Sequence, residues 1–212
     1  MNPRPLIITC LLASLAAQSV IAHDEDHGPY FNVDLGVARV DDVKLKEFPG
    51  AGPGTKLEFD PGLRLSYGGG YRLKEWLSLG LESGLIANSI KDADAALVQV
   101  PLMGNIELRL PNKSPLVPFI GGGPGASISV IGLDKESLGG GTTVDGADAD
   151  AVFAWQVYGG VRVKIGHNIS LGAVYKYYSA NAPTWEVGGT SENIRIGRTR
   201  THSISASFRM DF

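Results

Sequence analysis

The stretch 201–212 alternates between apolar and polar side chains at every step, and this pattern restricts the fold more than any other in the chain. Successive residues of an extended strand face opposite ways, so the two sets lie on different faces. One face holds His202, Ile204, Ala206, Phe208, Met210 and Phe212, and the other holds Ser203, Ser205, Ser207, Arg209 and Asp211. Because chain ends usually fray into water, an aromatic residue at Phe212 indicates a strand anchored in a sheet.

Comparable alternation recurs along the chain and predicts eight strands in total. The 28 Gly and 12 Pro lie among these short runs, as expected for β-structure with many turns. The predicted strands are 30–40, 62–71, 77–85, 98–109, 116–131, 153–164, 169–178 and 201–212. We therefore predict an all-β fold, an eight-stranded antiparallel up-and-down barrel.

Proline and glycine complicate two of these strands. Pro101 is unfavourable inside the fourth strand because proline cannot donate a ladder hydrogen bond. Pro118, Pro124 and the glycines 121–123 blur the register of the fifth strand, so we expect a bulge there. The glycine runs 68–70 and 139–141 lack the Lys-Ser/Thr of phosphate loops, and we interpret them as turn and bulge segments.

The connections between the predicted strands alternate in length. Those after the second, fourth and sixth strands are short, whereas the others are long and variable in composition. This asymmetry is typical of membrane barrels with long extracellular loops and short periplasmic turns. The long connections include 41–56, 132–150 and 179–198.

The first 22 residues read as a secretory signal peptide. Arg4 precedes an apolar run at 6–17, and small residues stand at the cleavage position before His23. The run is shorter than the roughly 20 residues that a membrane-spanning helix needs. A lipid anchor on Cys10 is disfavoured because no small residue adjoins it, and this single cysteine leaves with the leader. We therefore divide the chain into a signal peptide (1–22), a polar segment (23–29) and a barrel (30–212).

Alternation alone does not say which face of the barrel points inward. A secreted barrel of the lipocalin kind would turn its apolar face inward around a ligand. Three features favour the opposite arrangement, in which the apolar face meets lipid: charges on the other face, aromatic residues toward strand ends, and Phe212 at the end of the closing strand. No later segment is apolar enough for a spanning helix, so a membrane-spanning form requires a closed sheet.

Three segments resemble the small outer-membrane β-barrel proteins of Gram-negative bacteria, the opacity-protein and OmpA-like group. They are Phe153-Ala154-Trp155-Gln156, the run from Asn168-Ile169-Ser170-Leu171 to Tyr175-Lys176-Tyr177-Tyr178, and the closing strand. The resemblance implies a monomer in the bacterial outer membrane, surrounded by its lipids and lipopolysaccharide. It also implies that the barrel-assembly machinery recognises the closing strand through Phe208, Met210 and Phe212.

The polar face carries charges of both signs. An eight-stranded barrel is just wide enough for its own side chains, and unpaired charges there are costly, so we predict cross-lumen pairs that plug the barrel. With Glu58 and Asp60 near the rim, acidic and basic residues number six each, and Arg64, Glu82, Glu107 and Arg162 are expected at the centre. The predicted network is Asp34, Arg64, Glu82, Glu107, Arg109, Arg162, Lys164, Lys176, Arg209 and Asp211.

Other candidate chemistry is sparse. The segment 23–27 combines two His with three carboxylates, but we interpret it as a solvated tail because nothing nearby would orient metal ligands. The run 177–182 is similar to the active-site strand of lipid A deacylases, where a His precedes the Ser by two residues. That position is Tyr177 here, so Ser179 lacks an activating base. We expect no catalytic site, metal or cofactor.

The function predicted from these features is a structural or surface-interaction role of the adhesion or opacity type. An extracellular ligand would be contacted through the loops 41–56, 132–150 and 179–198. A narrow channel for small or apolar solutes is the alternative, and a lipid A-modifying enzyme is the third possibility. The mild acidity, 22 Asp and Glu against 19 Lys and Arg, gives no support for nucleic-acid binding.

Overall fold

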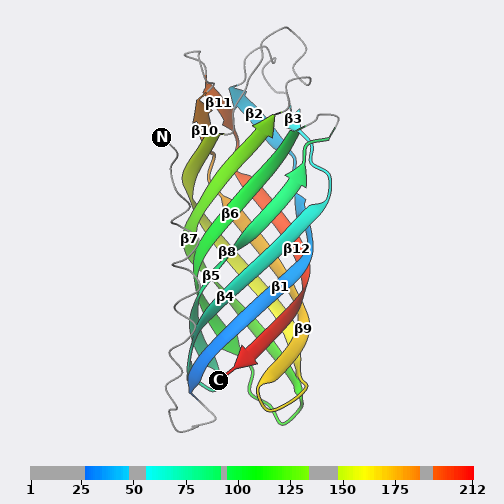
Figure 1. Ribbon diagram of the computed structural model, residues 1–212, viewed down its shortest axis with the longest axis vertical. Coiled ribbons are helices and arrows are strands. Elements are labelled where there is room, and N and C mark those ends of the chain that lie inside the picture. Colours follow the sequence, from blue (N-terminus) through cyan, green and yellow to red (C-terminus); the bar gives the residue numbers. More distant parts are fainter. Residues whose placement is uncertain (1–26, 48–55, 92–94, 134–147, 187–192) are drawn as a thin grey trace, which may run out of the picture.

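Eight long antiparallel strands close into a barrel in the computed structural model (Figure 1). The structure describes residues 27–47, 56–91, 95–133, 148–186 and 193–212, so the predicted leader and residues 23–26 lie outside the described residues. Within the described part, no helix is long and apolar enough to cross a bilayer. The predicted eight-stranded barrel is confirmed. Its strands are β1 (Gly28–Val40), β4 (Gly62–Lys74), β5 (Leu77–Ser89), β6 (Ala95–Arg109), β7 (Leu116–Leu133), β8 (Asp148–Lys164), β9 (Ile169–Ala180) and β12 (Thr199–Asp211).

Pairing of the first and last strands closes the ring. The order around the barrel is β1-β12-β9-β8-β7-β6-β5-β4, and β4 returns to β1. The register between β1 and β12 runs from Tyr30 opposite Asp211 to Val40 opposite Thr201. The backbone N–H of Phe212 also donates to the carbonyl of Pro29 at 3.0 Å. The closing strand is thus held to its end, and no strand of the barrel keeps an unpaired edge.

Several strands are longer than their alternation indicates. β8 begins at Asp148 rather than at 153, and β9 continues to Ala180. The extra residues pair in unbroken register, for example Asp148 with Ile131 on β7. These strands extend past the region of regular alternation because their backbones still form hydrogen bonds with the neighbouring strands.

The predicted bulge in the fifth strand is wrong. β7 pairs with β8 in constant register from Leu116 opposite Val163 to Ile131 opposite Asp148. The glycines serve close packing instead, because a Cβ on Gly121 would lie 2.5 Å from the ring of Tyr158. An irregular register occurs elsewhere, at Arg72 to Lys74 beside the turn into β5.

The run 68–70 is likewise part of a strand rather than a turn. It lies within β4, where a Cβ on Gly70 would meet the hydroxyl of Tyr30 at 2.8 Å. The run 139–141 lies outside the described residues. Pro101 stays within β6, and the ladder to β5 is interrupted beside it, between Ser83 opposite Leu102 and Ile86 opposite Gln99. The register is the same on both sides of that gap.

A second, small sheet stands at the end of the barrel that carries the long connections, here called the loop end (Figure 1). Its order is β10 (Thr184–Glu186), β11 (Asn193–Ile196), β2 (Val43–Glu47) and β3 (Lys56–Leu57). We predicted that the connections 41–56 and 179–198 are loops, but parts of both form strands of the small sheet. These strands are too short to show alternation, and the pairing of β11 with β2 joins segments that lie far apart in the sequence.

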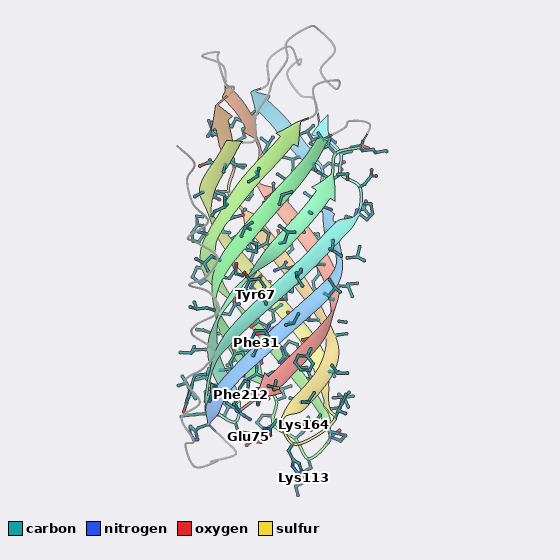
Figure 2. The ribbon with its side chains drawn as sticks, viewed as in Figure 1. Phe31, Tyr67, Glu75, Lys113, Lys164 and Phe212 are labelled. Carbon is teal, nitrogen blue, oxygen red and sulfur yellow. The ribbon has the colours of Figure 1, made fainter. Side chains whose placement is uncertain are left out.

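The outer wall of the barrel is apolar. Alternate residues project outward, including Leu81 and Ile204, which are 67% and 68% exposed. Figure 2 shows Phe31 and Tyr67 on this wall. Glu75 and Lys113 lie at the end of the barrel opposite the loop end, here called the turn end. An apolar wall around a closed sheet is the arrangement that suits lipid contact.

This architecture predicts that the folded protein resists SDS until it is heated. Each strand of the ring is paired with both neighbours over most of its length, so detergent gains little by opening the closed sheet. Unheated and boiled samples should therefore migrate differently on an SDS gel. Identical mobility, together with recovery in the soluble periplasmic fraction, would contradict the membrane arrangement.

Candidate functional site

The centre of the lumen holds four buried charges that form a neutral group, here called the central cluster (Asp34, Arg64, Glu82 and Lys176). Lys176 Nζ lies 2.8 Å from a carboxylate oxygen of Asp34 and 2.8 Å from one of Glu82. Arg64 Nη2 lies 3.3 Å from Glu82. Each residue comes from an inward-facing position of β1, β4, β5 or β9, because period two sends every second side chain into the lumen.

Nearer the turn end, Glu107 is surrounded by three arginines, and this group is called the Glu107 cluster (Glu107, Arg109, Arg162 and Arg209). Arg162 donates to both carboxylate oxygens of Glu107, at 2.8 and 3.1 Å. Arg209 donates to Oε1 at 3.0 Å, and Arg109 Nε lies 3.9 Å away. Two-point contact between a guanidinium and a carboxylate is both strong and geometrically specific.

Several contacts cross the lumen between opposite strands. In the ring order, β4 faces β8, β5 faces β9 and β6 faces β12. Arg64 donates to Gln156 at 2.8 Å across the first pair, and Lys176 donates to Glu82 at 2.8 Å across the second. The Arg209–Glu107 bond spans the third pair, as does a 3.1 Å bond from Gln99 to Thr199. Side chains thus bridge the full width of the barrel at successive levels.

Aromatic rings pack among these charges. The guanidinium of Arg162 lies 3.6 Å from the ring centre of Phe119, and that of Arg209 lies 3.6 Å from the ring centre of Tyr30. Tyr158 packs against Phe119 at 6.3 Å between centroids. The sequence prediction did not include these rings in the network. Alternation could have identified two of them. Tyr30 lies on the same face of β1 as Asp34, and Tyr158 lies on the same face of β8 as Arg162.

The loop end of the lumen is filled by apolar residues that the sequence reasoning missed. Next to the polar interior comes a buried layer that includes Ile86, Met103 and Tyr178. Beyond it lies a second buried cluster, here called the loop-end cap: Val40, Val43, Phe59, Ile90, Ala95, Leu97 and Ile196. Val40 and Leu97 occupy inward positions that the alternation rule assigned to polar residues. They are apolar because residues of the small sheet cover them.

The predicted balance of six acidic and six basic inward residues is wrong. Glu58 and Asp60 are exposed at the loop end, and Glu58 pairs there with Lys91 at 3.0 Å. Arg72 follows the predicted strand 62–71 and was therefore expected in the turn, but it belongs to β4 and lies 3.5 Å from Asp211. Among the described residues that line the lumen from the central cluster to the turn end, seven side chains are basic and four are acidic: Arg64, Arg72, Arg109, Arg162, Lys164, Lys176 and Arg209 against Asp34, Glu82, Glu107 and Asp211.

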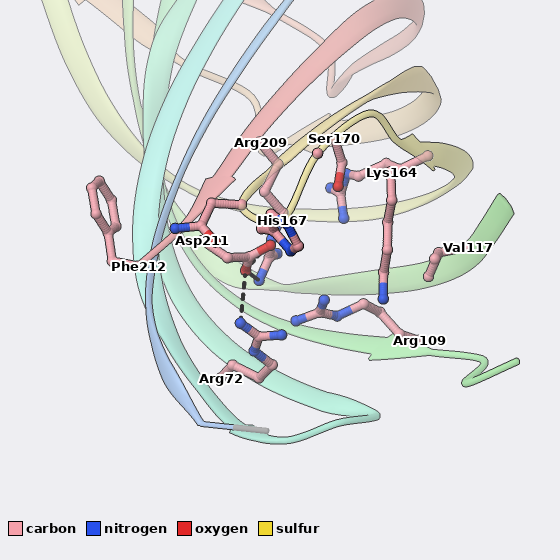
Figure 3. Close-up of a pocket in the computed structure, with 12 residues that line it drawn as sticks. Arg72, Arg109, Val117, Lys164, His167, Ser170, Arg209, Asp211 and Phe212 are labelled. Carbon is pink, nitrogen blue, oxygen red and sulfur yellow. Dashed lines mark hydrogen bonds and ion pairs between the residues drawn. The ribbon is translucent and has the colours of Figure 1, made fainter. Parts of the chain in front are cut away.

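The structure distributes the predicted network over three levels. Asp34, Arg64, Glu82 and Lys176 meet in the central cluster, and Glu107, Arg109, Arg162 and Arg209 meet below it. Asp211 lies 3.0 Å from Arg209, at the turn end. Lys164 does not reach either cluster but lines a cavity at the turn end, shown in Figure 3.

The closing-strand residues proposed as an assembly signal lie on the outer wall. Phe208 is paired with Val33 and Leu171 on the two neighbouring strands, and Met210 is paired with Phe31 and Ile169. Phe212 is exposed at the turn end. Their recognition by the assembly machinery stays a prediction.

The segment similar to lipid A deacylases runs along the loop end of β9. The side chain of Ser179 is buried, and Tyr177 packs its ring against Trp155 and His202. The His202 ring directs Nδ1 to the hydroxyl of Tyr175 at 2.6 Å and Nε2 to Asp41 at 3.6 Å. The nearby imidazole is thus engaged with Tyr175 and Asp41. Among the described residues, no group of three His, Cys, Asp or Glu side chains could hold a metal ion.

Comparison with known proteins places this architecture in a family. A family model described as the outer membrane protein beta-barrel domain matches residues 8–212. No curated protein matches the chain. Many solved structures match this fold, and three of them, all at low identity, include an enzyme, so they show the fold and not the activity. The chain covers nearly all of each of them.

Neisserial surface protein A (NspA) has a TM-score of 0.58 at 19% identity, over 87% of this chain and 97% of NspA. OprG from Pseudomonas aeruginosa has a TM-score of 0.55 at 13% identity, over 88% of this chain and 98% of OprG. The outer membrane protease OmpT from Escherichia coli has a TM-score of 0.50 at 11% identity, over 87% of this chain and 97% of OmpT. With its closed ring, apolar wall and family match, the chain belongs to the outer-membrane β-barrel domain family.

Proposed function

We propose that this protein is an outer-membrane barrel with a closed lumen, which serves a structural or surface-interaction role of the adhesion or opacity type. The observation that carries the proposal is the stack of barriers inside the ring. Contacts between opposite strands bridge the lumen at the central and Glu107 clusters, and the loop-end cap fills it above them. A barrel blocked in this way acts through its outside surfaces.

The loop end is the surface that we assign to partner contact. The short turns, the start of β1 and the end of β12 all lie at the turn end, which we place in the periplasm. The connections 41–56, 132–150 and 179–198 then emerge outside the cell. The small sheet of β10, β11, β2 and β3 gives two of them a hydrogen-bonded base, and loops carried on a rigid base commonly hold binding residues.

The remaining partners follow from the same placement. Outer-membrane lipids and lipopolysaccharide would surround the apolar wall, and the assembly machinery would read Phe208, Met210 and Phe212 on the closing strand. We propose that the barrel works as a monomer, because ring closure leaves no strand edge for a second copy. We do not extend the proposal to catalysis, since Tyr177 occupies the position of the base in the deacylase-like segment.

A narrow channel for small or apolar solutes is the second candidate. The observation that favours it is the cavity at the turn end, which has a volume of about 520 Å³. Arg162 and Arg209 line this cavity, and both are bound to Glu107. The cavity would have to extend past this cluster and the central cluster to form a pathway.

Single-channel recording distinguishes these two functions. Purified barrel refolded into planar bilayers is expected to give no stable conductance steps, because cross-lumen side chains interrupt the water path. An open porin recorded under the same conditions shows that insertion and detection work. Reproducible steps from the unmodified protein would reject the closed lumen and establish the channel.

A further inference from the structure

Basic side chains converge on the turn-end cavity. Its lining includes Arg72, Arg109, Arg162, Lys164 and Arg209, with Asp211 as the one acidic side chain among the described lining residues. Figure 3 shows the charged ends of Arg72, Arg109 and Lys164 pointing toward the same space. These residues come from β4, β6, β8 and β12, so the closed ring brings together groups that are distant in sequence.

The positive charge of the lumen is concentrated at this cavity. The central cluster has two basic and two acidic side chains and is neutral. Around the cavity, five basic side chains stand against Asp211 and the underlying Glu107, an excess of three positive charges. Basic groups held this close repel one another, and a bound anion would relieve that repulsion.

Several of the arginines also have hydrogen-bonding capacity left over. Arg72 Nε, Arg109 Nε and Arg162 Nε are buried nitrogen atoms without a hydrogen-bond partner in the described part of the chain. Arg162 is 5% exposed, so its position is set by packing rather than by solvent. Buried donors that lack an acceptor are costly, and guanidinium groups pair best with the oxygens of phosphates and carboxylates.

We propose that the turn-end cavity is a binding site for a small multivalent oxyanion, a molecule that carries two or more phosphate or carboxylate groups. A volume of about 520 Å³ is larger than a single phosphate requires. It falls within the range of roughly 300 to 1,000 Å³ that small-molecule sites occupy. Arg162 and Arg209, both bound to Glu107, form the floor of the site, and Arg109 and Lys164 are its entrance-side ligands.

The site does not depend on the closed lumen. A ligand would enter from the turn end and leave by the same route, whether or not the barrel conducts. The proposal therefore adds a binding activity on the side that we assign to the periplasm. Conductance steps would reject the closed lumen without rejecting the anion site, and absence of anion binding would reject the site without rejecting the closed lumen.

Isothermal titration of the refolded barrel with inorganic pyrophosphate, and separately with citrate, tests the site. Ionic strength is held constant with sodium chloride so that general screening does not change. We expect saturable binding of at least one of the two anions. The phosphate and carboxylate arms show which oxyanion the arginines prefer.

A matched pair of double variants locates the binding. Arg109→Gln with Lys164→Gln removes two charges from the cavity, whereas Lys74→Gln with Lys113→Gln removes two exposed charges at the same end, outside its lining. The first pair should weaken binding at least about tenfold, because charged hydrogen bonds are lost. The second pair should leave the affinity within about twofold, since screened surface charges act weakly at a distance.

Folding is checked by the unheated band on an SDS gel. If the double variant at Arg109 and Lys164 does not fold, Lys164→Gln alone replaces it, because Lys164 is exposed and its loss leaves the buried pairs intact. Absence of saturable binding by both anions would overturn the proposal. Equal weakening in the cavity and control variants would also overturn it, because the effect would then be general surface attraction.

Discussion

Replacing Glu107 with alanine is expected to destabilise the folded barrel by about 3–5 kcal/mol, the usual cost of removing one partner from a buried ion pair. Glu107 accepts both hydrogen bonds of Arg162 and one from Arg209, with Arg109 close by. Without the carboxylate, three largely buried guanidinium groups face one another without a shared acidic partner. The temperature at which the unheated band disappears from an SDS gel should therefore fall markedly.

Two comparisons make this prediction specific. Glu82→Ala should also lower that temperature, because it removes the shared partner of Lys176 and Arg64. Glu58→Ala breaks an ion pair of similar length with Lys91, but the pair is exposed at the loop end and should matter little. An unchanged unfolding temperature for both lumen variants would show that the buried carboxylates do not hold the barrel together.

Replacing Leu97 with alanine is expected to destabilise the barrel by about 2–5 kcal/mol, the range for removing a buried leucine side chain from a packed core. Leu97 is 2% exposed and belongs to the loop-end cap. Its removal leaves a cavity among side chains that are held in place by both the ring and the small sheet. Urea unfolding of the refolded barrel measures the loss.

Leu102 provides the matched control for this variant. It lies on the same strand, β6, but faces outward and is 59% exposed. Detergent or lipid can fill the space left by Leu102→Ala, so a much smaller loss is expected. Equal losses for the two variants would show that the loop-end cap is not a packed core.

The outward half of the molecule could be predicted well from the sequence. Lipid contact requires an apolar side chain at every outward position. Which positions face outward follows from the alternation within each strand alone. Phe31, Leu81 and Ile204 were therefore assigned to the correct face from local alternation alone. The strand count and the short turns followed from the same local signals.

The errors arose where a residue's neighbours come from distant parts of the chain. A glycine run was interpreted as a bulge, but Gly121 makes room for the ring of Tyr158 from the adjacent strand. Arg72 was placed in a turn, whereas the ring brings it to Asp211 from the other end of the sequence. Sequence alternation contains no information about which side chain will stand opposite.

The local pattern of the sequence is enough to predict a closed sheet with an apolar wall, because period two and turn spacing are local properties. The division of the interior into the loop-end cap, the neutral central cluster and the basic turn-end cavity depends on contacts between distant strands. The contact between Arg64 and Gln156 joins residues 92 positions apart, on strands that face each other across the lumen. Such contacts exist only after ring closure sets the register of all eight strands, so no local pattern encodes them.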